Sequence, residues 1–537
     1  MRKSCIICLI TGSVLLLPIM FNAGWSLNDT SHHLYIMKYA PFSHISGEFS
    51  GGSDRFTPIM FPGHQLLSYI TFSPQSFFFY NYILAVLTIG LLLLLLDKLN
   101  IYHGYLVLCL IFVPGFNDSF YQIVNPEKEL IFLWVLLLNL IVVIKFGSVS
   151  KAWMNIIALI YVPIAIIPVF MKETSFIILF VFSFLLFALH SNLLKRKIYG
   201  VSKNFTLKIE SRYILVSNIS LSVIFVILYL VFTAGHDQGY LSLMTPDKTI
   251  SGRLMTSAKS LVLYAISDPL LVLSLPILFF YSLYQRIIQK KMIFIDSMSK
   301  YAPFIDACAF SALSLVAAYV VLGFHGYRYL FPAYPFGLIA LAGYLQIYLP
   351  LIKKNMNRIY ILVPSLLIVF LLVNSMLSSV NTAVFYKMSS YNFMQYKDAL
   401  IHKIDDINST GNTKVNFFLP GKKDIGYNAG RHRDILNFYE VNINSVNFEF
   451  NPINQNWIEQ NAAGHNESIV NRGDLLLITP NSTISQDQIM ANLQGLKLRE
   501  IMRTQSPNYF EIPEIRHFLK YLMLQRNPDA LVHQMIY

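Results

Sequence analysis

Long apolar stretches separated by short polar segments fill the chain from its start to about residue 380. Runs such as Ile83 to Leu96 and Leu130 to Ile144, with their flanks, reach the roughly 20 residues that a helix needs to cross a bilayer. The pattern predicts about eleven membrane-spanning helices. They are expected near residues 5–25, 77–97, 104–116, 129–147, 152–170, 174–193, 213–234, 260–284, 304–324, 329–349 and 357–379.

The composition supports an integral membrane protein. Of 537 residues, 55% are hydrophobic and 13% are charged, whereas soluble domains carry roughly 25% charged residues. This excludes a soluble enzyme, a nucleic-acid-binding protein and a secreted disulfide scaffold. The four cysteines all fall in apolar stretches, so the sequence predicts neither a disulfide framework nor a zinc site outside the membrane.

The distribution of positive charge predicts the topology. The N-terminal Met1-Arg2-Lys3 precedes an apolar run without a small-x-small cleavage site, which favours an uncleaved first span with a cytoplasmic N-terminus. The alternate loops on that side, with the N-terminus, hold roughly 18 Lys and Arg against about 8 on the other side. The net charge of +12 therefore reflects membrane orientation before any anionic partner.

The composition changes near Val380, where Asn, Asp, Lys and Glu return. We therefore divide the chain into a polytopic domain, 1–379, and an extracytoplasmic domain, 380–537. Strand-like runs at 415–419 and 475–478 alternate with helix-like segments at 391–407 and 486–496. The second domain is predicted to be a small α/β domain on the outer side.

Polar residues gather in the loops assigned to the outer face, including a long first loop at 26–74. For any one of them, solvation at the headgroup depth is the competing explanation. Lys172 and Glu173 could simply neutralise each other, and Arg328 could be an interfacial anchor between tyrosines. The candidates are Asp29, Asp54, Arg55, Asp118, Glu127, Lys172, Glu173 and Arg328.

Carboxylates and cations at one membrane surface suggest a group transfer. A carboxylate is a natural general base for an acceptor hydroxyl, and Arg or Lys is a natural partner for a departing phosphate. With the donor anchored in the bilayer, this chemistry describes sugar transfer from a polyprenyl phosphate. Asp306 falls at the cytoplasmic end of a span, and we interpret it as structural.

Several short motifs resemble segments of the multi-span glycosyltransferases of the GT-C type, which use lipid-phosphate-linked sugars at the periplasmic or lumenal face. Asn28-Asp29 stands just after the first span, where members carry acidic residues, and Asp54-Arg55-Phe56-Thr57-Pro58 is similar to an Arg-Phe-x-Pro segment. Asn125-Pro126-Glu127, Lys172-Glu173-Thr174 and Arg328-Tyr329-Leu330-Phe331-Pro332 also resemble recurrent segments. The resemblance implies a mainly α, GT-C-like membrane fold with an outer C-terminal domain.

The resemblance also implies roles for single residues in an inverting hexosyltransferase. Asp29 would be the general base, because Asn28 stands where many members have a second acid. Lys172 and Arg328, with Arg55, would bind the donor phosphate. Asp54, Asp118, Glu127 and Glu173 would position the substrates. Asp118 is not part of an Asp-x-Asp or Glu-x-Asp pair, so we expect no cofactor and favour metal independence, although members that need a divalent metal exist.

The expected partners are a polyprenyl-phosphate sugar donor, a glycan or lipid-linked acceptor and membrane lipid, with no nucleic acid. The resemblance places the chain in a bacterial inner membrane and suggests modification of surface polysaccharide such as the O-antigen of lipopolysaccharide. Three alternatives remain open: a polysaccharide polymerase or ligase that uses polyprenyl-diphosphate oligosaccharides, a transporter, and a purely structural or binding membrane protein. A transporter would be expected to carry charges near the bilayer midplane.

Overall fold

The structure is a computed structural model, and the residues that it describes make up most of the chain. These are 2–21, 24–25, 29–39, 57–59, 61–123, 125–147, 150–189, 209–233, 250–287, 301–323, 326–355, 358–409, 415–419, 425–443, 446–450 and 475–476. The predicted site residues Asp54 and Arg55 and the predicted helix at 486–496 lie outside these ranges.

The described chain is mainly helical, and nine of its helical segments are long and apolar enough to cross a membrane. This confirms the prediction of an α-helical, multi-pass membrane protein. The segments are α1 with η1 (Lys3–Phe21), α5 (Pro74–Lys98), α7 (Pro126–Phe146), α8 (Lys151–Met171), α11 (Ile209–Thr233), η4 with α14 (Leu270–Ile287), α16 (Ala302–Val321), α17 and η5 with most of α18 (Tyr327–Tyr348), and α19 (Arg358–Ser409).

Three predicted spans differ from the prediction, one in its length and two in their continuity. The segment 174–193 forms α9 (Ser175–Leu189), which is shorter than the other spans. The segment 104–116 forms the 3₁₀-helix η3 (Gly104–Phe112) followed by α6 (Pro114–Phe120), because Pro114 cannot donate to the preceding turn. The segment 260–284 is divided at Asp268–Pro269 between α13 (Ile250–Ser267) and a π-helical turn, η4 (Leu270–Ser274).

Proline sets the start of many helices. Among the described helices, α4 (Pro62–Ser68), α5, α6, α7 and α16 all carry Pro in the first turn. A helix has no intrahelical acceptor for its first N–H groups, so Pro loses nothing there and its fixed φ suits the helix. In α7, the Asn125 side chain adds an N-cap by accepting the Glu127 N–H at 3.0 Å.

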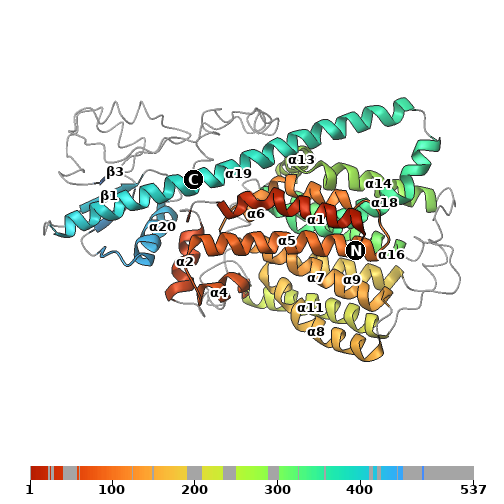
Figure 1. The fold of residues 1–537 in the computed structure, drawn as a ribbon, viewed down its shortest axis with the longest axis horizontal. Helices are drawn as coiled ribbons and strands as arrows, with labels where there is room; N and C mark the ends of the chain where they lie inside the picture. Colours follow the sequence, from red (N-terminus) through yellow and green to blue (C-terminus); the bar gives the residue numbers. More distant parts are fainter. Residues whose placement is uncertain are drawn as a thin grey trace.

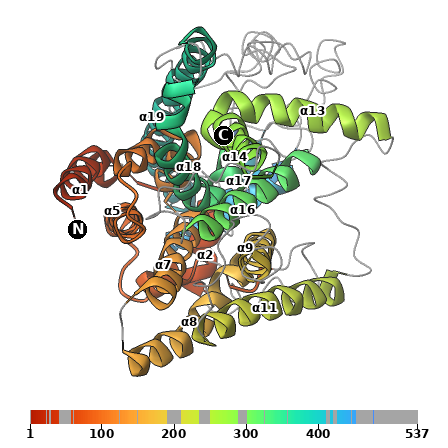
Figure 2. The same ribbon diagram turned by 90° about the vertical axis from the view of Figure 1, so that its right-hand side faces the viewer.

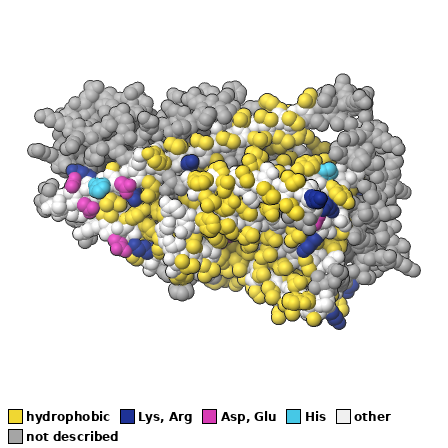
Figure 3. Space-filling model, viewed as in Figure 1, with side chains coloured by type: hydrophobic (Ala, Val, Ile, Leu, Met, Phe, Trp, Pro, Cys, Tyr) yellow, Lys and Arg dark blue, Asp and Glu magenta, His cyan; other side chains and the backbone are white. Residues whose placement is uncertain are grey.

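The helices form a bundle whose most buried members are α18 (Tyr334–Asn355), α7 and α16, with α1, α8 and α11 on the outside (Figure 2). Aromatic contacts connect the central helices. The Phe182 ring of α9 packs edge-to-face on Phe304 of α16, with centroids 5.5 Å apart, and on Phe336 of α18, with centroids 5.6 Å apart. A broad hydrophobic surface covers the middle of the bundle, and most of the visible charged side chains lie toward its two ends (Figure 3). This is the distribution that a bilayer requires of a spanning bundle.

One end of the bundle carries the extra elements. Figure 1 places α2 (Asp29–Tyr39), α4 and α20 (Ile425–Phe438) at the end opposite the N-terminus. Lys38 of α2 donates to the Phe438 carbonyl at 2.6 Å and pairs with Glu440 at 2.8 Å. The first predicted outer loop and the C-terminal region thus meet at one end, as their assignment to the same membrane side requires.

The C-terminal region begins inside a helix. α19 runs 52 residues through position 380, so the proposed domain boundary lies within it. The strand-like run 415–419 coincides with β1 (Val415–Leu419), which pairs in parallel with β2 (Val446–Phe450) and β3 (Leu475–Leu476) in the order β2-β1-β3. Helix α20 makes the crossover that parallel strands need. The remainder of 380–537 lies outside the described residues, and the α/β domain as a whole stays a prediction.

Candidate functional site

Four of the predicted site residues come together where α6, α7, α17 (Tyr327–Leu330) and the α8–α9 turn meet. Asp118 comes from α6, Glu127 from the first turn of α7, Lys172 from the turn and Arg328 from α17. We call these four residues the charged cluster. Residues more than 200 positions apart thus converge at the end of the bundle that also carries α2, α4 and α20 (Figure 1).

Glu127 and Lys172 form a buried ion pair. Lys172 Nζ donates to Glu127 Oε1, and the two residues are 6% and 3% exposed. The position of Glu127 in the first turn of α7 suits a carboxylate, because the helix dipole is positive there. Its second oxygen, Oε2, is buried and has no hydrogen-bond partner in the described part of the chain. One carboxylate oxygen is therefore committed to Lys172 and the other is available.

Asp118 acts as a junction between three helices. Its Oδ2 accepts the Arg328 backbone N–H at 3.1 Å, and its Oδ1 accepts from Gln122 Nε2 at 2.8 Å and from the hydroxyl of Tyr386 in α19. Both oxygens are thus occupied in the folded protein. Asp118 fixes α17 relative to α6 and α19, and it therefore positions Arg328.

Arg328 is the cation of the cluster that is best placed to meet a ligand. Its side chain is only half-buried, and no described carboxylate lies within the 4 Å of a salt bridge. Asp118 and Glu127 are close enough to interact with it electrostatically, and the Tyr329 ring centroid lies 5.7 Å from the guanidinium carbon. By contrast, Lys172 is buried and neutralised by Glu127.

The other predicted residues are only partly placed. Asp29 begins α2 at the same end of the bundle, but its side chain lies outside what the structure describes. Glu173 is half-buried beside Lys172 in the turn. In the described residues, no group of three or more His, Cys, Asp or Glu side chains is arranged to hold a metal ion. Metal independence stays a prediction.

A second polar cluster, which we call the His64 clamp, was not predicted. The Glu129 carboxylate accepts the backbone N–H groups of Gly63 at 3.1 Å and His64 at 3.0 Å, and the Tyr80 hydroxyl at 3.2 Å, while the His64 ring lies against it. The other ring nitrogen of His64 contacts Asn81 Oδ1 at 3.1 Å. The clamp therefore ties α4, from the first predicted outer loop, to α5 and α7.

The clamp depends on close packing. A Cβ at position 63 would lie 1.8 Å from the Tyr80 hydroxyl oxygen, so only glycine fits there. Burial lowers the pKa of His64, and this effect outweighs the opposing attraction of the Glu129 carboxylate. The signal for the clamp in the sequence is Asn81, an amide within an apolar run, which donates to the Gln122 carbonyl at 3.1 Å.

The two clusters adjoin through the segment between α6 and α7. Buried Lys128 donates to the carbonyls of Gln122 and Ile123 at 2.8 and 3.0 Å. Its neighbour Glu127 belongs to the charged cluster, and its other neighbour, Glu129, belongs to the His64 clamp. The sequence analysis assigned a role only to Glu127. The structure gives all three charged residues of the first turn of α7 a partner, and thereby a defined position.

No protein-family model, no curated protein and no solved structure matches this chain.

Proposed function

We propose that this chain is a membrane glycosyltransferase that moves a hexose from a polyprenyl-phosphate donor to a glycan or lipid-linked acceptor. The observation that supports it most is the convergence of Asp118, Glu127, Lys172 and Arg328 at one end of an apolar bundle. A donor anchored in the bilayer would present its phosphate at that depth. The resemblance of the motifs to GT-C-type enzymes supports the same reaction.

In this proposal Arg328 binds the donor phosphate. A guanidinium presents a planar fork of donors that matches phosphate oxygens, and Arg328 has no described ion pair to give up. Lys172 would act through its ion pair with Glu127, which holds that carboxylate close to Arg328. Arg55 and Asp54, from the first outer loop, would complete the donor and acceptor sites.

The reaction is a single displacement. The acceptor hydroxyl oxygen forms the new bond to the anomeric carbon while the bond from that carbon to the phosphate oxygen breaks. The acceptor proton passes to a carboxylate, for which Asp29 is the first candidate and the unpartnered Oε2 of Glu127 is the second. The polyprenyl phosphate leaves as an anion next to Arg328, which offsets the developing charge. The sugar configuration inverts.

The proposal includes a bacterial inner membrane location, a cytoplasmic N-terminus and an α/β domain at 380–537 on the periplasmic side that helps to bind the acceptor. Surface polysaccharide such as O-antigen is the proposed acceptor. The distribution of positive charge supports this orientation, because Lys98 and Lys151 lie at the bundle end opposite the charged cluster.

The test is transfer of radiolabelled glucose from polyprenyl-phosphate glucose to cell-surface glycan in membranes that contain the chain. We expect Asp29→Asn to abolish transfer and Arg328→Gln to reduce it by about 10²- to 10³-fold. Arg328→Lys keeps the charge but loses the fork, so it should recover transfer only in part. Lys151→Gln, at the opposite end of the bundle, is the matched control and should leave transfer unchanged.

Two results would contradict the proposal. Full activity of Arg328→Gln would remove the phosphate site from the charged cluster. Transfer only from a polyprenyl-diphosphate oligosaccharide would instead identify a polymerase or ligase. If Asp29→Asn stays active while Glu127→Gln loses activity at normal expression, the reaction stands and Glu127 is its base.

A further inference from the structure

Lys145 lies at the end of α7 opposite the charged cluster. It is 18 residues from Glu127, which places it about 27 Å away along the helix. The last turn of a helix favours a cation, because the macrodipole is negative there. The distribution of positive charge predicts that this end of the bundle faces the cytoplasm. The Lys145 ammonium group is nevertheless buried.

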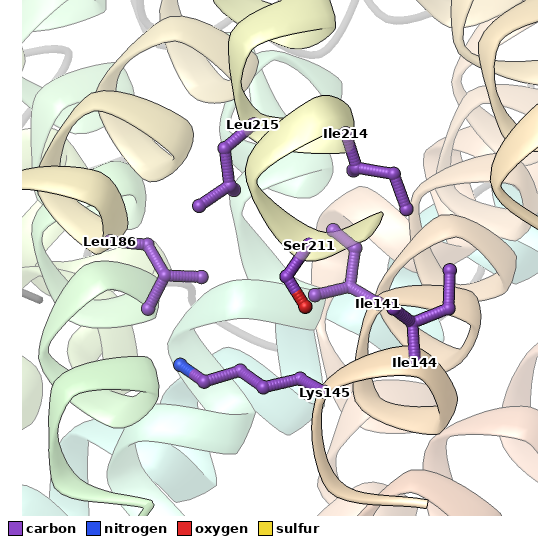
Figure 4. Close-up of a pocket in the computed structure, with 7 residues that line it drawn as sticks. All are labelled: Ile141, Ile144, Lys145, Leu186, Ser211, Ile214 and Leu215. Carbon is purple, nitrogen blue, oxygen red and sulfur yellow. The ribbon is translucent and has the colours of Figure 1, made fainter. Parts of the chain in front are cut away.

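The Lys145 ammonium points into a small pocket between α7, α9 and α11. Figure 4 shows Lys145 Nζ and the Ser211 hydroxyl directed into the same space. Neither Nζ nor Ser211 Oγ has a hydrogen-bond partner in the described structure, and Ser211 is only 5% exposed. The other lining residues are aliphatic: Ile141, Ile144, Leu186, Ile214 and Leu215.

The Lys145 ammonium and the Ser211 hydroxyl together favour an anionic ligand at this pocket. The Lys145 ammonium lies 5.0 Å from the centroid of the Phe146 ring but has no hydrogen-bond partner in the described structure. Leaving a buried ammonium without hydrogen bonds is unfavourable, and a lysine at a helix end can usually extend to the membrane surface instead. Three N–H donors and a hydroxyl face the pocket, and the described lining residues offer no carboxylate. The pocket itself has room for about one water molecule. A phosphate would therefore lie at its opening, with the Lys145 side chain turned outward to meet it, and the aliphatic lining residues would contact an attached hydrocarbon chain.

We infer that this pocket binds the phosphate of an anionic membrane lipid. The elements that form it face the bilayer: Phe187 of α9 and Val216 of α11, next to the lining residues, are 45% and 51% exposed. Figure 2 shows α11 at the periphery of the bundle. An acyl chain can therefore lie along this surface while its headgroup reaches Lys145. Basic pockets between membrane helices on the cytoplasmic side are typical sites for anionic headgroups.

The experiment measures ligand-dependent thermal unfolding of the full chain purified in detergent, followed by tryptophan fluorescence. The probes are dioctanoyl-phosphatidylglycerol, dioctanoyl-phosphatidylcholine and inorganic phosphate. A ligand that binds only the folded state raises Tm. We expect the glycerol lipid to raise Tm by several degrees in a saturable way, and the choline lipid and free phosphate to have little effect.

The variants locate the effect. Lys145→Met should weaken the apparent affinity for the glycerol lipid by at least about tenfold, and Ser211→Ala should weaken it less. Lys151→Met, an exposed cation at the same end, is the matched control and should respond like the wild type. Without lipid, Lys145→Met should be at least as stable as the wild type, because it removes a buried charge that has no hydrogen-bond partner in the described structure.

Equal responses of the wild type and Lys145→Met to the glycerol lipid would overturn the inference. A wild type that responds to no probe would do the same. Stabilisation by inorganic phosphate that competes with the lipid would reassign the pocket to free phosphate. If Lys145→Met fails to fold, the lipid affinity of Ser211→Ala is the test. An unchanged affinity of that variant for the glycerol lipid would count against the site.

Discussion

Asp118 holds the backbone of Arg328 in place: its Oδ2 accepts the Arg328 N–H at 3.1 Å, across 210 positions of sequence. The bond joins α6, which interrupts the third crossing of the bundle, to α17, which begins a central helix. Both carboxylate oxygens of Asp118 accept hydrogen bonds within the fold. The Arg328 guanidinium, by contrast, has no ion pair in the described residues. We therefore expect Asp118 to act on function only through Arg328.

Asp118→Asn tests this link. An amide places an N–H group where one oxygen now accepts, so the Arg328 backbone or the Tyr386 hydroxyl loses its acceptor. Small displacements of a positioning group cost up to about 10²-fold in rate. We expect transfer to fall by about 10- to 100-fold with a raised KM for the donor, measured by initial rates in proteoliposomes.

Asp398→Asn is the matched control, since it makes the same change on an exposed part of α19. A loss of thermal stability in Asp118→Asn with an unchanged donor KM would show that Asp118 serves the fold alone.

The Glu127–Lys172 pair is predicted to be strongly coupled. Removing one partner leaves a buried charge alone, which costs about 3–5 kcal/mol. Lys172→Met and Glu127→Gln should therefore each destabilise the protein, and the double variant should lose less than the sum of the two. A double-mutant cycle on chemical unfolding in detergent measures the coupling.

The exposed Lys38–Glu440 pair is the control for this cycle, and Glu440→Gln should change stability little. Additive effects at Glu127 and Lys172 would show that the pair is not formed as the structure has it.

Gly115 permits the close approach of α6 and α17. A Cβ at this position would lie 2.6 Å from the Tyr327 carbonyl oxygen, which belongs to the backbone next to Arg328 and cannot easily move. Gly115→Ala should therefore lower Tm and, by displacing α17, reduce transfer by about 10-fold or more. At Gly90 in α5, a Cβ would make only an ordinary 3.5 Å contact with Leu9.

Gly90→Ala is thus the matched control and should be neutral or slightly stabilising, because alanine is the better helix former. Equal stability and activity of Gly115→Ala and Gly90→Ala would mean that α6 and α17 can separate without consequence.

The sequence pattern predicted the helices well because bilayer spans depend on length and hydropathy alone. It also found Asp118, Glu127, Lys172 and Arg328, because charges in tight loops between apolar helices are unusual. It could not predict their pairing. Whether Lys172 faces Glu127 or a ligand depends on how α7 and α8 pack against each other. The periodicity of hydrophobic residues does not reveal this packing.

The same limit explains the residues that were missed. Tyr386 lies between the predicted last span and the helix-like segment predicted at 391–407, and the pattern did not show that one helix, α19, joins the two and brings Tyr386 to Asp118. His64 resembles any polar residue of a long loop until α4 folds against Glu129. The break at Val113–Pro114 was detectable, since Pro114 interrupts the apolar run, but its effect on the third span was not expected.

The His64 clamp predicts a pH dependence of stability. Burial lowers the pKa of His64 below its ordinary value of about 6.5. The unfolded chain then binds a proton more readily than the folded one, so stability begins to fall as the pH drops below about 6.5 and continues to fall toward the lower pKa of the folded state. For one proton the slope is at most about 1.4 kcal/mol per pH unit.

The thermal midpoint between pH 5 and 8 measures this effect. His64→Gln should flatten the acid limb, whereas His402→Gln, on an exposed face of α19, should leave it unchanged. An acid limb that survives in His64→Gln would assign the transition to other groups, of which Glu129 is the nearest carboxylate.

The orientation of the bundle is the last prediction, and it decides which membrane face carries the charged cluster. The four native cysteines are buried or half-buried and can be replaced, and single cysteines can then be introduced as Glu440→Cys and Lys151→Cys. Glu440 lies at the end that contacts α2, and Lys151 begins α8 at the opposite end. A membrane-impermeant maleimide should label Glu440→Cys on intact spheroplasts and Lys151→Cys only after the membrane is permeabilised. The reverse pattern would place the charged cluster in the cytoplasm and exclude an outward-facing transferase, whereas the expected pattern would place Arg328 on the side where a flipped polyprenyl-phosphate sugar is exposed.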